Sequence, residues 1–267
     1  MKLIKKIIRS LLPPILINFY KKLVTKKSFI YGFSNWNSAK IKSTTYNTDD
    51  VFKKTLNSAR KIRDGLAVYE RDSVIFDKIQ YDWPLVSSLM LAANVNKRLS
   101  ILDYGGALGT TYRQIKKFFD LLDCKKNWII LEQKSFVDIG KQEFENNELS
   151  FINSLDELNK SVNLVLFGSS ICYVEKPYDV LSDIIQLKPN FILFTKTPFS
   201  DLDEDNLSIQ IIRPSIYNAT YPIWTFSKNK FKNHFLSSYD LVEEWEEQFQ
   251  YTDDDRVMMG MLFKLRT

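Results

Sequence analysis

Three glycines within five positions, Gly105, Gly106 and Gly109, constrain this chain more than any other feature of its sequence. The 267 residues contain only eight glycines, so this group marks a tight turn. An apolar run ending at Leu102 precedes it, and apolar residues at helical spacing follow from Ile115, which predicts a strand, a glycine turn and a helix. Such a turn leaves backbone N–H groups free at the positive end of the helix and lets a ligand approach the backbone.

The residues between the glycines narrow the choice of ligand. Asp103 comes just before the turn, and Ala107 takes the middle position of an acidic-x-G-x-G-x-G pattern that ends at Gly109. A dinucleotide site would need G-x-G-x-x-G, but Thr110 stands where its third glycine would be. The spacing resembles motif I of class I S-adenosylmethionine (SAM) methyltransferases. The alternative is an ordinary strand-to-helix turn of another α/β protein.

Beyond the turn, strands and helices alternate, which is typical of a parallel α/β sheet. Further strands are predicted at 128–131, 149–152, 162–167 and 191–194, and strand-like segments close the chain at 207–213, 221–227 and 259–265. Thr111 and Gln114 fit a capping box at the start of the first helix of this part. The sequence therefore predicts a Rossmann-like α/β fold of the class I methyltransferase type, with helices on both faces and an N-terminal helical extension.

Three parts are expected along the chain: a basic amphipathic segment at 1–27, a mostly helical cap at 28–95, and the ligand-binding domain at 96–267. The net charge of +5 is too small to indicate nucleic-acid binding. Two cysteines and one histidine form neither a Cys/His metal site nor a disulfide framework. A reducing, cytoplasmic setting without a metal is the natural interpretation.

The first 25 residues place lysines among isoleucines and leucines. The uncharged run from Ser10 to Tyr20 is shorter than the roughly 20 residues of a membrane span, and Pro13 and Pro14 interrupt it. This pattern indicates either a segment that lies on an anionic membrane surface, peripheral at the inner membrane, or an amphipathic helix packed on its own domain.

In open α/β sheets, ligands bind beyond the carboxyl ends of the strands. Glu132 ends the second predicted strand of the sheet and could accept both ribose hydroxyls of an adenosine ligand. Ribose recognition alone fits SAM and NAD equally, and the glycine spacing favours SAM. The predicted cofactor-binding residues are Asp103, Gly105, Gly106, Ala107, Gly109, Glu132, Gln133 and Ser169.

Several segments together resemble a family of methyltransferases from bacterial surface-polysaccharide and lipopolysaccharide gene clusters. They are LDYGGALGTTYRQ, WIILEQKSFVDIGKQEF, SSICYVEKPYDVL, TKTPF and IYNATYPIW. The resemblance covers nearly the whole chain and implies SAM-dependent methyl transfer to a sugar or glycan intermediate, small or lipid-linked. The chain departs from the family pattern at Thr195 and Lys196, which stand where the family has an acidic-Arg pair.

A hydroxyl acceptor would need a base, because its proton must leave as the methyl group arrives. The candidate bases are His234, Glu175 and Asp179, with Tyr173 and Tyr217 as orienting residues. Two other functions stay open: a nicotinamide-dependent sugar dehydrogenase, and a non-catalytic protein of this fold in a glycan-assembly complex.

Overall fold

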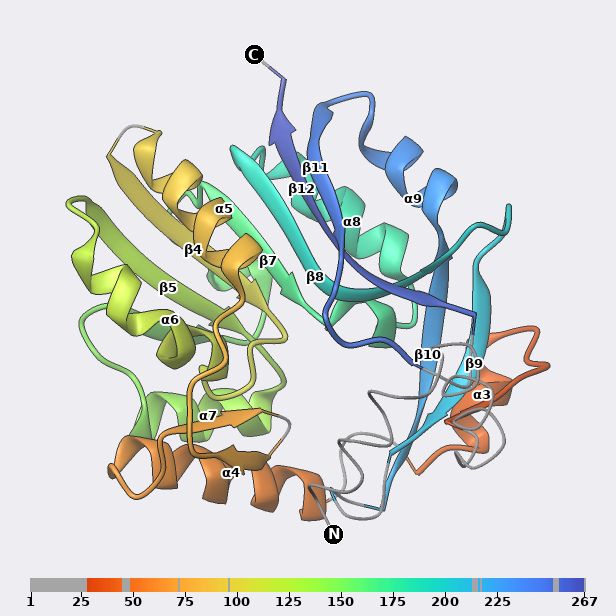
Figure 1. Ribbon diagram of the computed structural model, residues 1–267, viewed down its shortest axis with the longest axis horizontal. Coiled ribbons are helices and arrows are strands. Elements are labelled where there is room, and N and C mark those ends of the chain that lie inside the picture. Colours follow the sequence, from red (N-terminus) through yellow and green to blue (C-terminus); the bar gives the residue numbers. More distant parts are fainter. Residues whose placement is uncertain are drawn as a thin grey trace, which may run out of the picture.

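A ten-stranded sheet forms the centre of the protein in a computed structural model (Figure 1). The structure describes residues 28–44, 49–71, 73–95, 97–212, 216, 218–251 and 255–266. The predictions for the N-terminal basic segment and for Tyr217 lie outside these residues.

Five parallel strands build the central part of this sheet, in the spatial order β6-β5-β4-β7-β8. They are β4 (Arg98–Tyr104), β5 (Lys125–Leu131), β6 (Leu149–Ile152), β7 (Leu164–Gly168) and β8 (Phe191–Ser200). The chain first moves outward from β4 to β5 and β6, then returns to the other side of β4 for β7 and β8. The strand order therefore reverses between β4 and β7, and ligands of open α/β sheets bind beside such a switch point.

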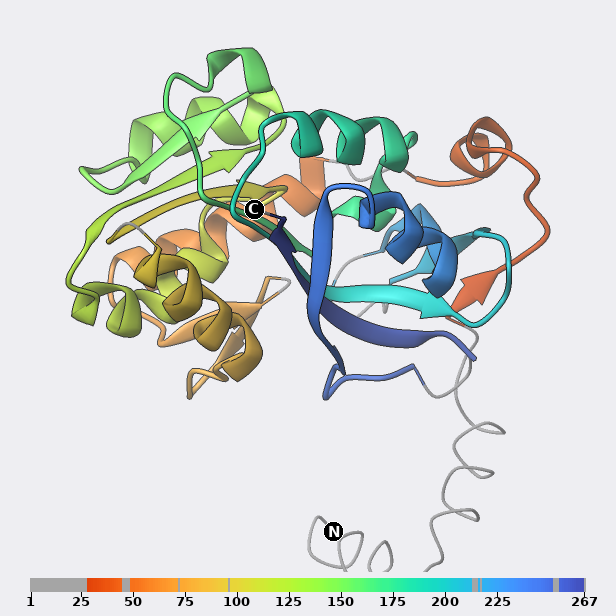
Figure 2. The same cartoon turned by 90° about the horizontal axis from the view of Figure 1, so that it is seen from above.

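Helices cover both faces of the sheet, as predicted. Neighbouring residues of β4 point in opposite directions, so Ile101 belongs to one buried cluster and Leu102 to the other. Figure 2 shows α5 on one side of the sheet and α8 on the other. The helices are α3 (Trp36–Ile41), α4 (Asp49–Arg63), α5 (Trp83–Asn94), α6 (Thr110–Leu121), α7 (Lys134–Glu143), α8 (Pro177–Gln186) and α9 (Lys228–Phe235), with the 3-10 turns η1 (Leu155–Glu157) and η2 (Ile171–Tyr173).

The C-terminal part adds an antiparallel pair, β11 (Tyr239–Glu246) and β12 (Val257–Leu265), of which β12 pairs with β8. A second wing of the sheet consists of β9 (Asn206–Ile211), β10 (Thr220–Ser227) and β1 (Phe29–Ile30). The wing joins the central strands where β10 pairs with the last two residues of β8. The sequence predicted β9, β10 and β12, but it did not predict β11.

The segment 28–95, expected as a mostly helical cap, holds α3, α4 and α5 together with three short strands. It contains β1, which extends the second wing, and a small separate hairpin of β2 (Tyr69–Arg71) and β3 (Val74–Phe76). The apolar side of α5, including Leu85 and Leu89, belongs to the same buried cluster as Ile101 of β4. Part of this segment therefore contributes directly to the core of the sheet.

A β-bulge interrupts the pairing of β8 with β12. Thr195 and Lys196 on β8 together oppose the single residue Gly260 on β12. Gly260 also lies against the indole ring of Trp245 on β11, because a Cβ atom built at this glycine would lie 2.2 Å from the ring. A side chain at this position would therefore displace the indole.

Gly260→Ala should lower the free energy of unfolding by about 1–3 kcal/mol, the usual cost of overpacking a buried contact. Urea unfolding followed by circular dichroism measures this change. The matched control is Gly168→Ala, where the nearest atom to the added methyl group lies 4.0 Å away. Equal stability of the two variants would contradict the tight contact with Trp245.

Candidate functional site

The glycine turn joins β4 to α6 as predicted. Gly105 and Gly109 have φ angles of +74° and +88°, and Ala107 between them has +48°. These angles favour glycine, because a Cβ atom is strained in the left-handed region. The turn therefore depends on glycine at two of its positions and tolerates alanine at a third.

The predicted capping box at Thr111 and Gln114 is wrong. Gly109 is the N-cap of α6, and no side chain caps the helix there. The Gln114 side chain donates instead to the backbone carbonyl of Gln80. Thr110 donates its hydroxyl to Glu70 of β2. The first turn of α6 is thus fixed from outside by the β2 region.

The two strands at the switch point touch through the turn. A Cβ atom on Gly105 would lie 2.6 Å from the Cβ of Ser170, which follows β7. The N–H of Gly105 donates to the carbonyl of Leu131 at the end of β5, at 2.9 Å. Gly105 therefore holds the carboxyl ends of β4, β5 and β7 together, and its close approach is to Ser170.

Asp103 lies beneath the turn with only 1% of its surface exposed. Its Oδ2 accepts a hydrogen bond of 3.0 Å from the indole of Trp128. A Cβ atom on Gly106 would lie 2.5 Å from the same oxygen. Burial raises the pKa of Asp103 to about 7, although the Trp128 hydrogen bond opposes the shift. This carboxyl group supports the turn from below and does not face solvent.

Glu132 ends β5, as the sequence predicted, and is only partly exposed. Desolvation raises the pKa of its carboxyl group to about 7; the backbone N–H of Gln133 lowers it and the charge of Asp103 raises it further. Its negative charge, together with burial, raises the pKa of Tyr104. The Gln133 side chain is exposed and makes no capping bond to α7. Glu132 is therefore an acidic group of this edge that is partly open to a ligand.

The end of β7 carries a second polar turn. Ser169 has a φ of +63° and donates its N–H to the carbonyl of Thr195 on β8, at 3.0 Å. Ser170 Oγ is buried and has no hydrogen-bond partner among the described residues. Tyr173, on the following 3-10 turn, donates its hydroxyl to Gln210 of β9 at 2.7 Å. Predicted residues Ser169 and Tyr173 thus lie close to the glycine turn.

The predicted base His234 lies between two helices. His234 lies on α9 against α8, with its ring 5.2 Å from that of Tyr178 and its Nε2 3.4 Å from Ser182 Oγ. Burial lowers the pKa of this histidine. Glu175 and Asp179 have exposed side chains. Of the residues proposed for catalysis, only Tyr173 has contacts that join the carboxyl edge to another element.

Sequence reasoning missed three residues that meet on β8: Asp82, Lys196 and Glu247. Lys196 donates its backbone N–H to Glu247 Oε1 at 3.0 Å, and its Nζ lies 3.7 Å from Asp82 Oδ2. Lys196 was noted only as a departure from a family pattern. The other two gave no signal because they are far away in sequence.

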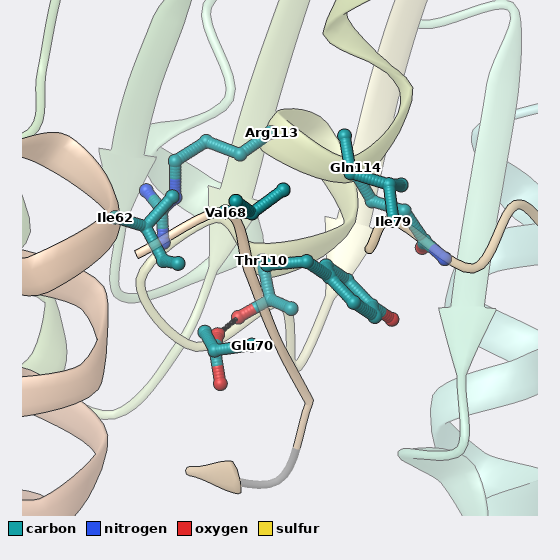
Figure 3. A pocket seen from close by; sticks show the side chains of 8 residues that line it. Ile62, Val68, Glu70, Ile79, Thr110, Arg113 and Gln114 are labelled. Atoms are coloured by element: carbon teal, nitrogen blue, oxygen red, sulfur yellow. Dashed lines mark hydrogen bonds between the residues drawn. The ribbon is translucent and has the colours of Figure 1, made fainter. Parts of the chain in front are cut away.

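A small cavity lies beside the first turn of α6 (Figure 3). Glu70, Thr110, Arg113 and Gln114 line part of it, and its volume is about 20 Å³. This is room for about one water molecule, so the cavity is too small for a nucleoside. Arg113 donates to the carbonyl of Leu108, and burial lowers its pKa to about 10. The cavity belongs to the support of the turn.

Within the described part of the chain, no group of three or more His, Cys, Asp or Glu side chains is arranged to hold a metal ion.

No protein-family model matches the chain, and no curated protein matches it. Solved structures do resemble it. The PH0226 protein from Pyrococcus horikoshii OT3 has a TM-score of 0.45 and 12% identity, covering 69% of this chain and 91% of that one. The N-terminal domain of EvdMO1, determined with SAH and D-fucose, has a TM-score of 0.48 and 10% identity, with 79% and 97% covered. The N-methyltransferase NodS from Bradyrhizobium japonicum WM9, in complex with S-adenosyl-L-homocysteine, has a TM-score of 0.43 and 12% identity, with 79% and 100% covered. All three TM-scores are below 0.5, so the function is inferred from the site itself.

Asp103→Asn should change how stability depends on pH. The folded protein holds a proton on Asp103 up to about pH 7, whereas an unfolded Asp loses it near pH 4. Wild-type stability should therefore fall as the pH rises from about 4 to 7. From pH 5 to pH 8, the asparagine variant should gain roughly 2 kcal/mol relative to wild type.

Urea unfolding at both pH values measures this difference, with Asp123→Asn as the control at an exposed aspartate. A constant difference between Asp103→Asn and wild type at the two pH values would show that Asp103 ionises normally in the fold.

Proposed function

We propose that this protein is a SAM-dependent methyltransferase acting on a polar acceptor. The observation that carries the proposal is the meeting of Glu132, the glycine turn and the Ser169–Ser170 turn at the point where the strand order reverses. An acidic group at the end of the strand next to a glycine turn suits the ribose of an adenosine ligand. The acidic-x-G-x-G-x-G spacing with Ala107 supports SAM over a dinucleotide.

The residues of this edge fit the parts of the donor. Glu132 would accept the two ribose hydroxyls, while the uncapped start of α6 would receive the negative carboxylate of the methionine part. The buried Ser170 Oγ, which lacks a partner among the described residues, would gain one from a bound ligand. SAM supplies a methyl group already activated by a sulfonium, so the protein mainly has to align the acceptor with it.

Aromatic side chains beside the β7 end support a sugar ring as the acceptor. Tyr31, Tyr173 and Phe249 are 53%, 36% and 50% exposed, a large fraction for such rings. Tyr173 and Phe249 are connected: Tyr251 packs edge-on against Phe249 and accepts a hydrogen bond from Gln210, which in turn accepts from Tyr173. Flat rings with polar edges bind the apolar face of a sugar and its hydroxyls together. The resemblance to polysaccharide gene-cluster methyltransferases agrees with such an acceptor.

The first alternative is a nicotinamide-dependent dehydrogenase, because Glu132 could bind the ribose of NAD as well as that of SAM. The second alternative is a non-catalytic protein of this fold. Ligand binding distinguishes the dehydrogenase from the methyltransferase, and methyl transfer distinguishes the non-catalytic protein from it.

Glu132→Gln should weaken SAM binding by about 1.5–3 kcal/mol, the value of a hydrogen bond to a charged group. Wild-type affinity should also fall as the pH drops from 8 to 6, because Glu132, with a pKa of about 7, becomes protonated. In Glu132→Gln, SAM affinity should depend less on pH, because glutamine does not titrate. Calorimetry with SAM at pH 6, 7 and 8 measures both effects.

Asp138→Asn, an exposed change on α7, is the control for this experiment. Binding of NAD in place of SAM would favour the dehydrogenase. SAM binding that is equal in Glu132→Gln and wild type at pH 8 would remove Glu132 from the site.

We also propose that residues 1–25 hold the enzyme against an anionic membrane surface, where lipid-linked sugars are presented. Their lysines lie among apolar residues, and each basic residue near such a surface contributes roughly 1 kcal/mol. Among the described helices, none is both long and apolar enough to cross a membrane. Attachment at the surface is the form of membrane binding that this segment suits.

Deletion of residues 1–25 should abolish co-sedimentation with vesicles that contain anionic lipid and leave SAM affinity unchanged. Binding of the full chain should rise with the anionic fraction and weaken as salt is raised. Vesicles of neutral lipid are the control. Equal sedimentation of the deleted and full chains would refute the membrane role of this segment.

A further inference from the structure

A cluster of one lysine and two carboxylates lies on β8, one residue beyond the position that pairs with the last residue of β7. Its members are Asp82, which caps α5, Lys196 in β8, and Glu247, which follows β11. Lys196 links the other two: its backbone N–H donates to Glu247 Oε1 at 3.0 Å, and its Nζ lies 3.7 Å from Asp82 Oδ2. Three segments far apart in the sequence thus place charged groups at one point.

The bulge in β8 brings Lys196 into this cluster. Two residues of β8 oppose one residue of β12 at this position, and Lys196 has a φ of +51°. A bulge turns a side chain and its backbone groups away from the regular ladder. Here the Lys196 N–H is turned to the Glu247 carboxylate, so the distortion of the strand creates the contact.

The cluster belongs to the same edge as the glycine turn. Gly105 of the turn approaches Ser170, and the neighbouring Ser169 donates its N–H to Thr195, the residue before Lys196. Only β7 separates β4 from β8, so the cluster and the turn are about two strand spacings, or roughly 10 Å, apart. A ligand whose ribose is held at β5 and which extends past β4 toward β7 would point its far end at this cluster.

The charges of the cluster do not balance. Asp82 is 7% exposed, its Oδ1 accepts from the N–H of Leu85, and its Oδ2 has no hydrogen-bond partner among the described residues. The cluster therefore holds two carboxylates and one ammonium group, which pairs with Asp82, while Glu247 accepts from the backbone of Lys196. Burial and the charge of Asp82 raise the pKa of Glu247, while Lys196 lowers it. A carboxylate whose pKa is raised holds a proton more strongly than usual, as a group that accepts a proton must.

We infer that Glu247 is the catalytic base that takes the proton of an acceptor hydroxyl, with Lys196 and Asp82 as positioning residues. The inference rests on the proposed methyltransferase function and names the acceptor chemistry of the same site. The acceptor oxygen forms a bond to the methyl carbon, and the bond between that carbon and the sulfur breaks. The sulfur keeps the electron pair as a neutral thioether, while the hydroxyl proton passes to the Glu247 carboxylate.

The loop that carries Glu247 also reaches the proposed sugar site. Phe249 and Tyr251 follow Glu247 closely, and Tyr251 accepts the hydrogen bond from Gln210 beside Tyr173. A sugar held by these aromatic rings would place its hydroxyls next to this part of β8. The proposed base and the rings of Phe249 and Tyr251 therefore come from one connection between β11 and β12.

The test uses the full chain, labelled SAM and a cell-envelope extract as the acceptor source. Glu247→Gln should lower the transfer rate at saturating SAM by 10²- to 10⁴-fold, the usual contribution of a general base. SAM affinity should stay within twofold of wild type. The matched control is Glu246→Gln, the exposed neighbour at the end of β11, which should transfer at the wild-type rate.

The pH profile separates a base from a merely structural residue. The wild-type rate of methyl transfer should rise with pH as Glu247 loses its proton. This rising limb of the pH profile should be absent in Glu247→Gln. Lys196→Met keeps the backbone N–H that Glu247 accepts but removes the ammonium group that lowers its pKa. The limb should therefore move to higher pH in that variant.

Transfer by Glu247→Gln at the rate of Glu246→Gln would overturn this inference and leave the methyltransferase function standing. A wild-type protein that binds no SAM would overturn the proposed function itself. A wild-type protein that binds SAM and transfers no label to the extract would contradict the inference and favour the non-catalytic alternative.

Discussion

The buried carboxyl group of Asp103 is the constraint on which the carboxyl edge of this sheet depends. Its oxygen is held by the Trp128 indole from the next strand and is covered by the backbone of Gly106. A carboxyl group without solvent is costly unless it is paired or protonated, and here its pKa rises to about 7. The carboxyl group sets how closely the backbone of the turn lies on the sheet, because a side chain at Gly106 would collide with it.

A series of contacts links this support to the rest of the edge. Gly105 meets Ser170 across the switch point, Ser169 binds Thr195, and the bulge after Thr195 brings Lys196 to Glu247. The first two steps join neighbouring parallel strands, and the third joins β8 to the connection between β11 and β12. Groups from four strands and two connecting loops are therefore held at fixed spacing without a metal or a disulfide among the described residues.

The sequence predicted those parts of the site that are local in the chain. The strand, glycine turn and helix around Gly105 and the acidic end of β5 at Glu132 come from short patterns, and the structure has both elements where they were expected. The capping box failed because the φ of +88° at Gly109 starts α6 one residue before Thr111, which the sequence could not show. Strand β11 was not predicted because it is an exposed edge strand. Its acidic residues obscure the alternation of apolar and polar positions that marks a strand.

The charged cluster on β8 could not be predicted from the sequence. Asp82, Lys196 and Glu247 are separated by more than a hundred and by about fifty positions, and only the packing of α5 and the β11–β12 connection brings them together. His234 shows the opposite failure: its residue type suggested a base, but α9 places it against α8.

A crystal structure of the protein grown with S-adenosylhomocysteine is the most decisive test of the proposed SAM site. We expect both ribose hydroxyls within hydrogen-bond distance of the Glu132 carboxylate. The methionine part should cross the glycine turn, with the sulfur facing the end of β7 and the adjacent part of β8. Density for the ligand anywhere other than this edge, or a ribose without contact to Glu132, would refute the proposed site.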